Sequence, residues 1–224
     1  MDNILCDLPG VCCYLDDVLI STPSQKEHLK RLETVFQLLT NASLRLKKKK
    51  CSFLASEVSY LWHRFDQTGL HPLNENVCAI SDAPRLTCLV KLHSYLGLLN
   101  YYAKFLPKIS TVLAPLNKLQ RKCVVYHWGQ DQEKTFQCSK ELLQSSQVLV
   151  HFDPDKDIIL AWDASPYGIG CVRSHKMPDG QEHPVAFASR PLTDTETRCA
   201  QLDKEGLSIV YRVKAFSPIS SQRS

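Results

Sequence analysis

The chain has 224 residues, of which 44% are hydrophobic and 22% charged, and it carries a net charge of +4. This composition is typical of a globular rather than a disordered protein, with one large or two small domains. The mild basic excess permits contact with nucleic acid without demonstrating it. No apolar run reaches the roughly 20 residues that span a bilayer, and the start Met1-Asp2-Asn3 lacks the basic residues of a signal peptide. We therefore expect an intracellular protein, cytoplasmic or nuclear, that is not secreted and has no membrane partner.

Ten cysteines are scattered along the chain without a Cys-x-x-Cys pair. This spacing favours neither a zinc site nor a disulfide framework. We expect buried, reduced thiols instead.

Two adjacent aspartates, Asp16 and Asp17, separate the apolar runs 11–15 and 18–20. Runs of this length around acidic residues predict a tight hairpin with an acidic turn. Two carboxylates at one tip repel each other unless a cation neutralises them, and Mg²⁺ is commonly held by one or two carboxylates together with substrate phosphates. A solvated turn is the more common explanation of an isolated Asp-Asp pair, so both interpretations stay open at this point.

Ser24 and Glu27 form a capping-box pattern before a predicted helix that Asn41 ends. Its apolar positions, which we expect to pack on one face, are Leu29, Leu32, Val35, Phe36 and Leu39. A run of four lysines follows, namely Lys47, Lys48, Lys49 and Lys50. Such a run is either a solvated stretch or a patch that attracts phosphates.

The segment from Val58 to Phe65 is β-prone, and Thr87 is the expected cap of a second helix. The aromatic end of that helix, Tyr101-Tyr102-x-x-Phe105, either packs in a core, which is the more common case, or stacks on bases. A short apolar segment follows at 112–119 across Pro115.

Residues 120–129 are predicted to form a boundary between domains, and a helix containing Phe136 is predicted to follow them. The period then changes to that of strands, with a buried strand expected at 158–162 and two more at 168–172 and 184–188. Thr193 and Glu196 form a second capping-box pattern, opening a helix with one predicted face made of Leu202, Gly206, Ile209 and Val213. Glu205 borders this face and would lie near Asp163 at the end of the first strand. Two such carboxylates form half of a metal site, although an isolated pair is more often a coincidence.

Several motifs in one order resemble a known family. Tyr14-Leu15-Asp16-Asp17 is similar to the Tyr-x-Asp-Asp box of reverse transcriptases. The downstream sequence resembles gypsy-type LTR retrotransposon Pol polyproteins in the segments 96–102, 105–107, 163–170, 184–190 and 204–210. The resemblance covers the chain from Met1 to about Phe216.

The resemblance implies an α+β fold, with a reverse-transcriptase palm hairpin and a helical thumb followed by a truncated ribonuclease H-like α/β domain. The implied domains are the C-terminal part of the palm at 1–66, the thumb at 67–125, the N-terminal part of the ribonuclease H-like domain at 126–216 and a tail outside the family at 217–224. The family synthesises DNA on RNA templates and cleaves the RNA of RNA–DNA hybrids as an endonuclease, with Mg²⁺, or in some cases Mn²⁺, as cofactor. An RNA–DNA hybrid or a template–primer duplex is therefore the expected partner.

Carried over by position, Asp16, Asp17, Asp163 and Glu205 are expected to be catalytic metal ligands. The expected nucleic-acid contacts are Tyr14, Trp62, Lys47, Lys48, Lys49 and Lys50. A two-ion site needs several carboxylates, so two residues alone form a weak site.

The sequence also departs from the family pattern. Met1 to Leu5 corresponds to an interior palm segment, which puts the fingers and a further polymerase aspartate outside the chain. Trp62 stands where the family has Gly, and the residues after Phe216 leave the pattern before the remaining ribonuclease H strands. The first strand would then become an exposed edge, and this half of the chain is expected to be partly folded or prone to aggregate. We expect a chain that is inactive alone, and three explanations remain open: an enzyme completed by sequence outside this chain, a nucleic-acid-binding remnant, or a translated relic without function.

Overall fold

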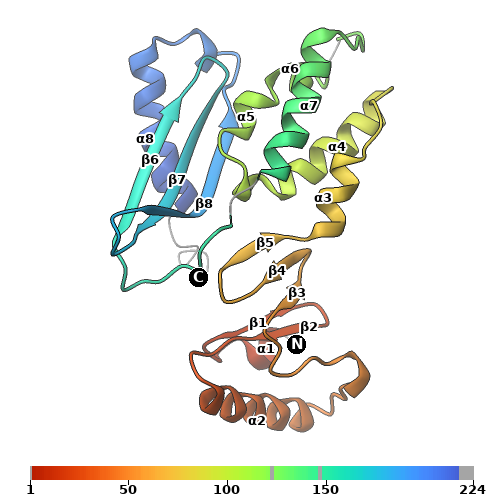
Figure 1. Cartoon of the computed structure of the whole chain (residues 1–224), viewed down its shortest axis with the longest axis vertical. Helices are drawn as coiled ribbons and strands as arrows, with labels where there is room; N and C mark the ends of the chain where they lie inside the picture. The colour runs from red at the N-terminus through yellow and green to blue at the C-terminus, as the bar shows by residue number, and fades with distance from the viewer. Residues whose placement is uncertain (1, 122–123, 146–147, 217–224) are drawn as a thin grey trace. The chain divides into compact units, whose positions relative to one another are not determined.

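The structure is a computed structural model that describes residues 2–121, 124–145 and 148–216. These residues form two compact units, one up to Gln67 and one from Thr68 onward (Figure 1). The predicted domain boundaries at 66, 125 and 216 remain predictions, and the predicted tail at 217–224 lies outside the described residues.

The first unit consists of short strands and one long helix. Its elements in chain order are α1 (Asp2–Leu5), β1 (Val11–Tyr14), β2 (Asp17–Ile20), α2 (Gln25–Asn41), the 3₁₀ turn η1 (Lys48–Lys50), β3 (Val58–Tyr60) and β4 (His63–Phe65). Strands β1 and β2 form the predicted hairpin, with Tyr14 opposite Asp17. Helix α2 begins as predicted, because the Ser24 hydroxyl accepts a hydrogen bond from the amide of Glu27.

The core of this unit is small. Its fully buried apolar residues are Leu5, Val35 and Leu39, against which the inner faces of β1 and β2 pack. The prediction of one packed face on α2 was wrong for two residues, since Leu29 and Phe36 are 51% and 38% exposed. Helical periodicity identifies a stripe but not how much of the stripe has a partner to pack against.

The β-prone segment 58–65 is a hairpin and not one strand. Strands β3 and β4 pair antiparallel with Tyr60 opposite His63, and the two residues between them, Leu61 and Trp62, both have positive φ. Positive φ at both central residues is the geometry of a type I′ turn, which usually requires Gly or Asn. The apolar side chains at these positions hid the turn from sequence analysis.

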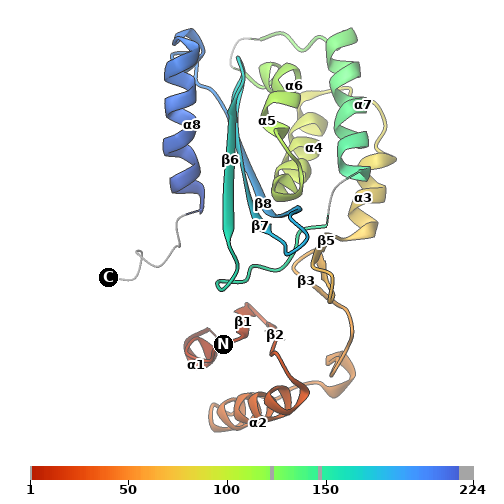
Figure 2. The ribbon, with the colours of Figure 1, turned by 60° about the vertical axis from the view of Figure 1, so that its left-hand side comes forward.

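The second unit places a three-stranded sheet between helices. Its elements are β5 (Leu70–Pro72), α3 (Asn74–Ser81), α4 (Leu89–Tyr101), η2 (Ala103–Phe105), α5 (Ile109–Val112), α6 (Ala114–Lys118), α7 (Gln130–Gln144), β6 (Ile158–Ala164), β7 (Gly168–Lys176), β8 (Glu182–Pro191), η3 (Glu196–Arg198) and α8 (Gln201–Phe216). Figure 2 shows α8 on one face of the sheet β6–β7–β8 and the layer of α3 to α7 on the other.

The helical layer holds the main core of this unit. Tyr102 and Phe105 are fully buried in it, whereas Tyr101 is 42% exposed. The expectation that the aromatic segment packs in a core was therefore right for Tyr102 and Phe105. Helix α4 starts one residue later than predicted, and Cys88 rather than Thr87 occupies the cap position, where no side chain bonds the helix. Helix α3 was not predicted at all, because its eight residues have no strong apolar period.

The sheet is antiparallel with β6 at its edge. The predicted buried strand is therefore exposed in part, and Ile158 and Trp162 are 46% and 39% exposed. At the opposite edge, the amide of Val150 donates to the carbonyl of Pro184 in β8.

The last helix differs from its prediction in start and in orientation. The Thr193–Glu196 capping box is formed, but it opens η3, and α8 begins only at Gln201. The side chains that pack on the sheet side are Lys204, Leu207, Ser208 and Tyr211. The predicted face was wrong, since Leu202, Ile209 and Val213 are exposed.

The cysteines also differ from expectation. Of those in the described part of the chain, Cys171 is buried and Cys6, Cys12, Cys78, Cys88, Cys138 and Cys199 are exposed, all as free thiols. Among the described helices, none is long and apolar enough to cross a membrane.

Candidate catalytic and nucleic-acid-binding residues

The tip of the β1–β2 hairpin presents its polar residues to solvent. Val11 and Cys13 point toward the core, so the alternation of the strand turns Cys12 and Tyr14 outward. Tyr14 is 54% exposed and pairs with Asp17 across the hairpin, which places both side chains on the same outer face. The turn itself consists of Leu15, with φ 52°, and Asp16. The structure thus brings together the three residues predicted here.

The two carboxylates of this tip have no counter-charge from the part of the chain that the structure describes. Within the described residues, no Lys, Arg or His forms a salt bridge with Asp16 or Asp17. Two exposed carboxylates without a basic partner suit a hard divalent cation, which prefers oxygen ligands. They remain a pair, however, because no three His, Cys, Asp or Glu residues of the described segments gather as a metal site.

A second exposed tip lies at the β3–β4 turn. Trp62 has φ 59° and its side chain is 62% exposed. The backbone therefore has the left-handed conformation that Gly adopts most easily, although the residue is Trp. The indole is an accessible flat surface of the kind on which bases stack.

The four lysines form a basic segment beside α2 in the chain. Lys47 precedes the 3₁₀ turn and Lys48, Lys49 and Lys50 form it, all with exposed side chains. None of the four has a salt bridge to an acidic residue of the described chain. Their positive charge is therefore available to an external anion.

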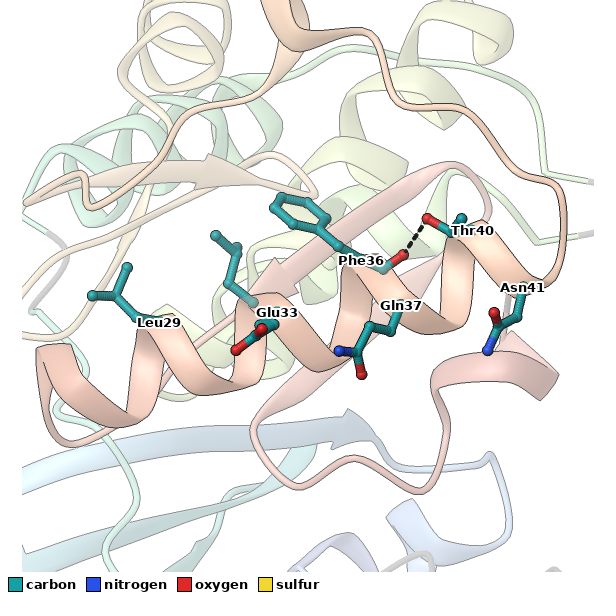
Figure 3. Close-up of a pocket in the computed structure, with 7 residues that line it drawn as sticks. Leu29, Glu33, Phe36, Gln37, Thr40 and Asn41 are labelled. Carbon is teal, nitrogen blue, oxygen red and sulfur yellow. Dashed lines mark hydrogen bonds between the residues drawn. The ribbon is translucent and has the colours of Figure 1, made fainter.

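Helix α2 carries a shallow apolar groove on its exposed side. Leu29, Leu32 and Phe36 line it together with the polar side chains of Glu33, Gln37, Thr40 and Asn41 (Figure 3). The Thr40 hydroxyl donates to the carbonyl of Phe36 within the helix. The groove contains no paired carboxylates or basic cluster, so it adds no chemistry to the hairpin tip.

Asp163 in the second unit has a different environment from Asp16 and Asp17. The Nζ atom of Lys108 lies 2.7 Å from its Oδ2. Lys108 is the residue before α5, with φ 50°. Sequence analysis missed this lysine, because nothing in its local sequence indicates a partner so far along the chain.

Glu205 lies on α8 and is held by a neighbour on the same helix. Its Oε1 accepts a hydrogen bond from Nε2 of Gln201, and the same Nε2 donates to the carbonyl of Ala164. Gln201 therefore links the Glu205 carboxylate to the end of β6.

Asp163 and Glu205 belong to opposite layers of the second unit. The indole of Trp162 lies 3.8 Å from the guanidinium of Arg212 on α8, so the next residue along the strand points to the other face. That face carries α5, in agreement with the ion pair between Asp163 and Lys108. The Asp163 carboxylate thus already has a cationic partner, and a metal ion bound to it would lie close to the positive charge of Lys108.

Both units are similar to known proteins. Residues 1–65 match the family described as reverse transcriptase (RNA-dependent DNA polymerase), and residues 128–224 match the RNase H-like domain found in reverse transcriptase. The Tf2-3 and Tf2-4 transposon polyproteins of Schizosaccharomyces pombe are 35% identical over 204 residues, which is 91% of this chain and 15% of each relative.

Solved structures agree with these matches. A foamy viral protease-reverse transcriptase dRH in complex with double-stranded DNA has a TM-score of 0.81 and 29% identity, covering 96% of this chain and 38% of that one. The foamy viral protease-reverse transcriptase in complex with an RNA/DNA hybrid also has a TM-score of 0.81, at 28% identity and with 96% and 29% coverage. This chain thus spans 15% of the two transposon polyproteins and 38% and 29% of the two viral proteins.

Proposed function

The chain belongs to the reverse-transcriptase and RNase H-like region of gypsy-type LTR retrotransposon polyproteins, and from this membership we propose that it binds template–primer duplex or RNA–DNA hybrid. The parent activity is RNA-directed DNA synthesis with ribonuclease H cleavage of the hybrid. We propose that the chain has neither activity by itself. It is then an enzyme segment that longer sequence completes, or a binding remnant, or a relic.

The hairpin tip carries the polymerase part of this proposal. Asp16 and Asp17 are the residues that would hold Mg²⁺ or Mn²⁺, with Tyr14 beside the primer end and Trp62 at the second tip. When bound in a complete site, two such ions stabilise the attacking and leaving oxygens of phosphoryl transfer. The chain's own contribution is to expose both carboxylates at the hairpin tip, Asp16 in the turn and Asp17 at the start of β2, without basic partners among the described residues.

Among the described residues, Asp16 and Asp17 have no third carboxylate beside them, which supports inactivity. Positioning and charge neutralisation supply most of the catalysis of phosphoryl transfer, and both depend on a complete ligand set. No group of three potential ligands exists in the described residues, and Asp163 already has a lysine partner. We therefore derive no step of RNA cleavage from Asp163 and Glu205.

Primer extension tests the inactivity. The purified chain, given an RNA template, a DNA primer and Mg²⁺ or Mn²⁺, is expected to leave the primer unextended. Extension by the wild-type chain that disappears in Asp17→Asn would overturn the proposal, because it would require a complete site at the hairpin tip.

The basic segment supports the binding part. Lysines that contact phosphates release counterions, so removing them weakens binding to all sequences and flattens its dependence on salt. We expect this result when Lys47, Lys48, Lys49 and Lys50 are all replaced by Gln and a labelled hybrid duplex is titrated at several salt concentrations.

A matched control comes from α2 in the same unit. Lys26→Gln with Lys30→Gln removes two exposed lysines outside the segment. For each charge removed, the salt dependence of hybrid binding should change less in this variant than in the fourfold variant. An unchanged slope in the fourfold variant would exclude the segment as the contact. Undetectable binding by the wild-type chain at low salt would favour a relic over a binding remnant.

A further inference from the structure

The N-terminal end of α5 is attached to the sheet by a row of polar contacts. Lys108 forms its ion pair with Asp163 of β6, and two hydroxyl pairs lie beside it. Lys108 contacts Asp163, Ser110 contacts Ser189, and Thr111 contacts Ser165. We call these three contacts the polar seam. All six residues lie within the second unit.

The first hydroxyl pair joins α5 to β8. The Oγ atom of Ser189 accepts from the hydroxyl of Ser110 at 2.7 Å and from the amide of Ser110 at 3.3 Å. Ser110 is only 7% exposed, so its polar atoms need partners inside the protein. Ser189 supplies one acceptor for both donors.

The second hydroxyl pair joins α5 to the turn after β6. Ser165 donates its single hydroxyl proton to the carbonyl of Gly168, so the 2.8 Å contact with Thr111 is one in which Thr111 donates. The same Oγ of Ser165 accepts from the amide of Gly168. The turn is thereby tied to α5 and closed on itself.

Glycines on β7 make room for this approach. A Cβ atom at Gly168 would lie 3.2 Å from the hydroxyl of Thr111 and 3.0 Å from the carbonyl of Arg190. At Gly170, opposite Asp163 in the sheet, a Cβ would lie 3.7 Å from Cγ of Lys108. The lysine stem therefore crosses the sheet over a position without a side chain.

The backbone of Lys108 is itself unusual. It adopts φ 50° and ψ 27°, the left-handed region that disfavours residues with a Cβ, and its side chain makes no capping bond to α5. A residue keeps such a backbone conformation only where contacts with its surroundings hold it there. The ion pair with Asp163 is such a contact.

We propose that Asp163 is a positioning residue, which fixes α5 on the sheet through Lys108, and that it is not a metal ligand in this chain. A divalent cation at Asp163 would have to displace the ammonium group or lie beside it against charge repulsion. This inference goes beyond the proposed function, because it holds whether or not the chain binds nucleic acid.

Amide exchange in the full chain tests the positioning role. Lys108→Met keeps the length of the side chain without its charge, and Asp163→Asn keeps the shape of the acid. Each should accelerate exchange of the Ser110 amide about two- to fivefold, the range expected for a half-exposed ion pair. The double variant should exchange no faster than the single ones, because both remove the same contact.

Arg121→Gln is the control, because it breaks the exposed ion pair with Asp194, at 2.9 Å, outside the polar seam. It should leave the exchange rate of the Ser110 amide unchanged.

Paramagnetic Mn²⁺ tests the second half of the proposal. In the ¹⁵N-labelled wild-type chain, Mn²⁺ should leave the amide signals of Asp163, Ala164 and Gly170 unbroadened. Broadening that Asp163→Asn removes and Lys108→Met strengthens would overturn the inference, as would single-variant exchange effects that add fully in the double variant. Hybrid binding by the lysine segment is measured in a separate titration, so failure of either proposal is recognised independently.

Discussion

Individual residues at both hairpin tips of the first unit have conformations that their side chains do not favour. Leu15, Leu61 and Trp62 all have positive φ. A left-handed conformation costs a residue with a Cβ about 1–2 kcal/mol relative to glycine. At Trp62 this cost accompanies a residue that is 62% exposed.

The cost at Trp62 leads to a prediction on stability. Trp62→Gly and Trp62→Ala both remove the indole, but only Ala retains the Cβ. The free energy of unfolding should be higher for Gly than for Ala by about 1 kcal/mol, the reverse of their order at negative φ. Urea unfolding of the two variants measures the difference. Equal stabilities, or a more stable Ala variant, would show that the turn relaxes to negative φ.

The Glu196 carboxyl makes the stability of the second unit depend on pH. Two hydrogen bonds of 2.9 Å from Arg190 hold the pKa of Glu196 at about 2, below its ordinary value of 4.5. A carboxyl with a lowered pKa in the folded state stabilises the fold above about pH 4.5, and this contribution is lost as the pH falls toward 2.

Urea unfolding between pH 7 and pH 3 checks this dependence. Glu196→Gln should be less stable than the wild type by about 1 kcal/mol at pH 7, the upper end of the range for solvent-screened ion pairs, and the difference should shrink below pH 4.5. Glu182→Gln, at an exposed glutamate without a salt bridge to a described residue, serves as the control. A difference that stays constant with pH would show that the Glu196 substitution acts through packing.

At the scale of elements, β6 is the most exposed part of the sheet. The amide of Lys176 donates to Asp157 and that of Ser165 to Gly168, so the odd-numbered residues of β6 bond to β7 and the even-numbered ones face outward. Two of the outward carbonyls have side-chain partners on α8. Arg212 donates to Leu160 at 3.5 Å, and Gln201 donates to Ala164 at 3.0 Å. Helix α8 thus covers part of an edge that sequence analysis expected to be open.

This cover predicts how self-association responds to mutation. Arg212→Ala removes the guanidinium over Trp162 and the donor to Leu160, so the edge of β6 should pair more readily with another chain. Light scattering after size-exclusion chromatography should show a larger oligomeric fraction than for the wild type. Lys214→Ala removes an exposed charge from the same helix and should not have this effect. Equal oligomeric fractions for the two variants would show that Arg212 does not protect the edge.

At the scale of the whole molecule, the two units differ in the size of their cores. The first unit has three fully buried apolar residues in its core, and the main cluster of the second has sixteen among the described residues. Each buried apolar side chain contributes about 1.5–3 kcal/mol of gross stabilisation. The first unit should therefore be the less stable one.

Hydrogen exchange under increasing urea tests this order. Peptides from residues 11–41 should lose protection at lower urea than peptides from residues 92–116, because each unit unfolds with its own core. Loss of protection in both regions at the same urea concentration would show that the chain unfolds as a single cooperative unit.

The sequence by itself determined the features that depend on local order. The acidic hairpin, the start of α2, the strands of the sheet and the family all follow from short motifs, because period, capping and turn chemistry act within a few residues. The acidic tip followed in the same way, although the turn consists of Leu15 and Asp16, and Asp17 is the first residue of β2.

Only the tertiary structure decided what each site residue contacts. Asp163 lies in β6 and Glu205 in α8, but the packing of α5 gave Asp163 a lysine, and Glu205 is bonded to Gln201 of its own helix. The face of α8 that packs was likewise predicted wrongly, because a helix with apolar residues on several sides is oriented by its neighbours and not by its own period. Contacts between residues distant in the chain depend on how whole elements pack, and local patterns carry no information about them.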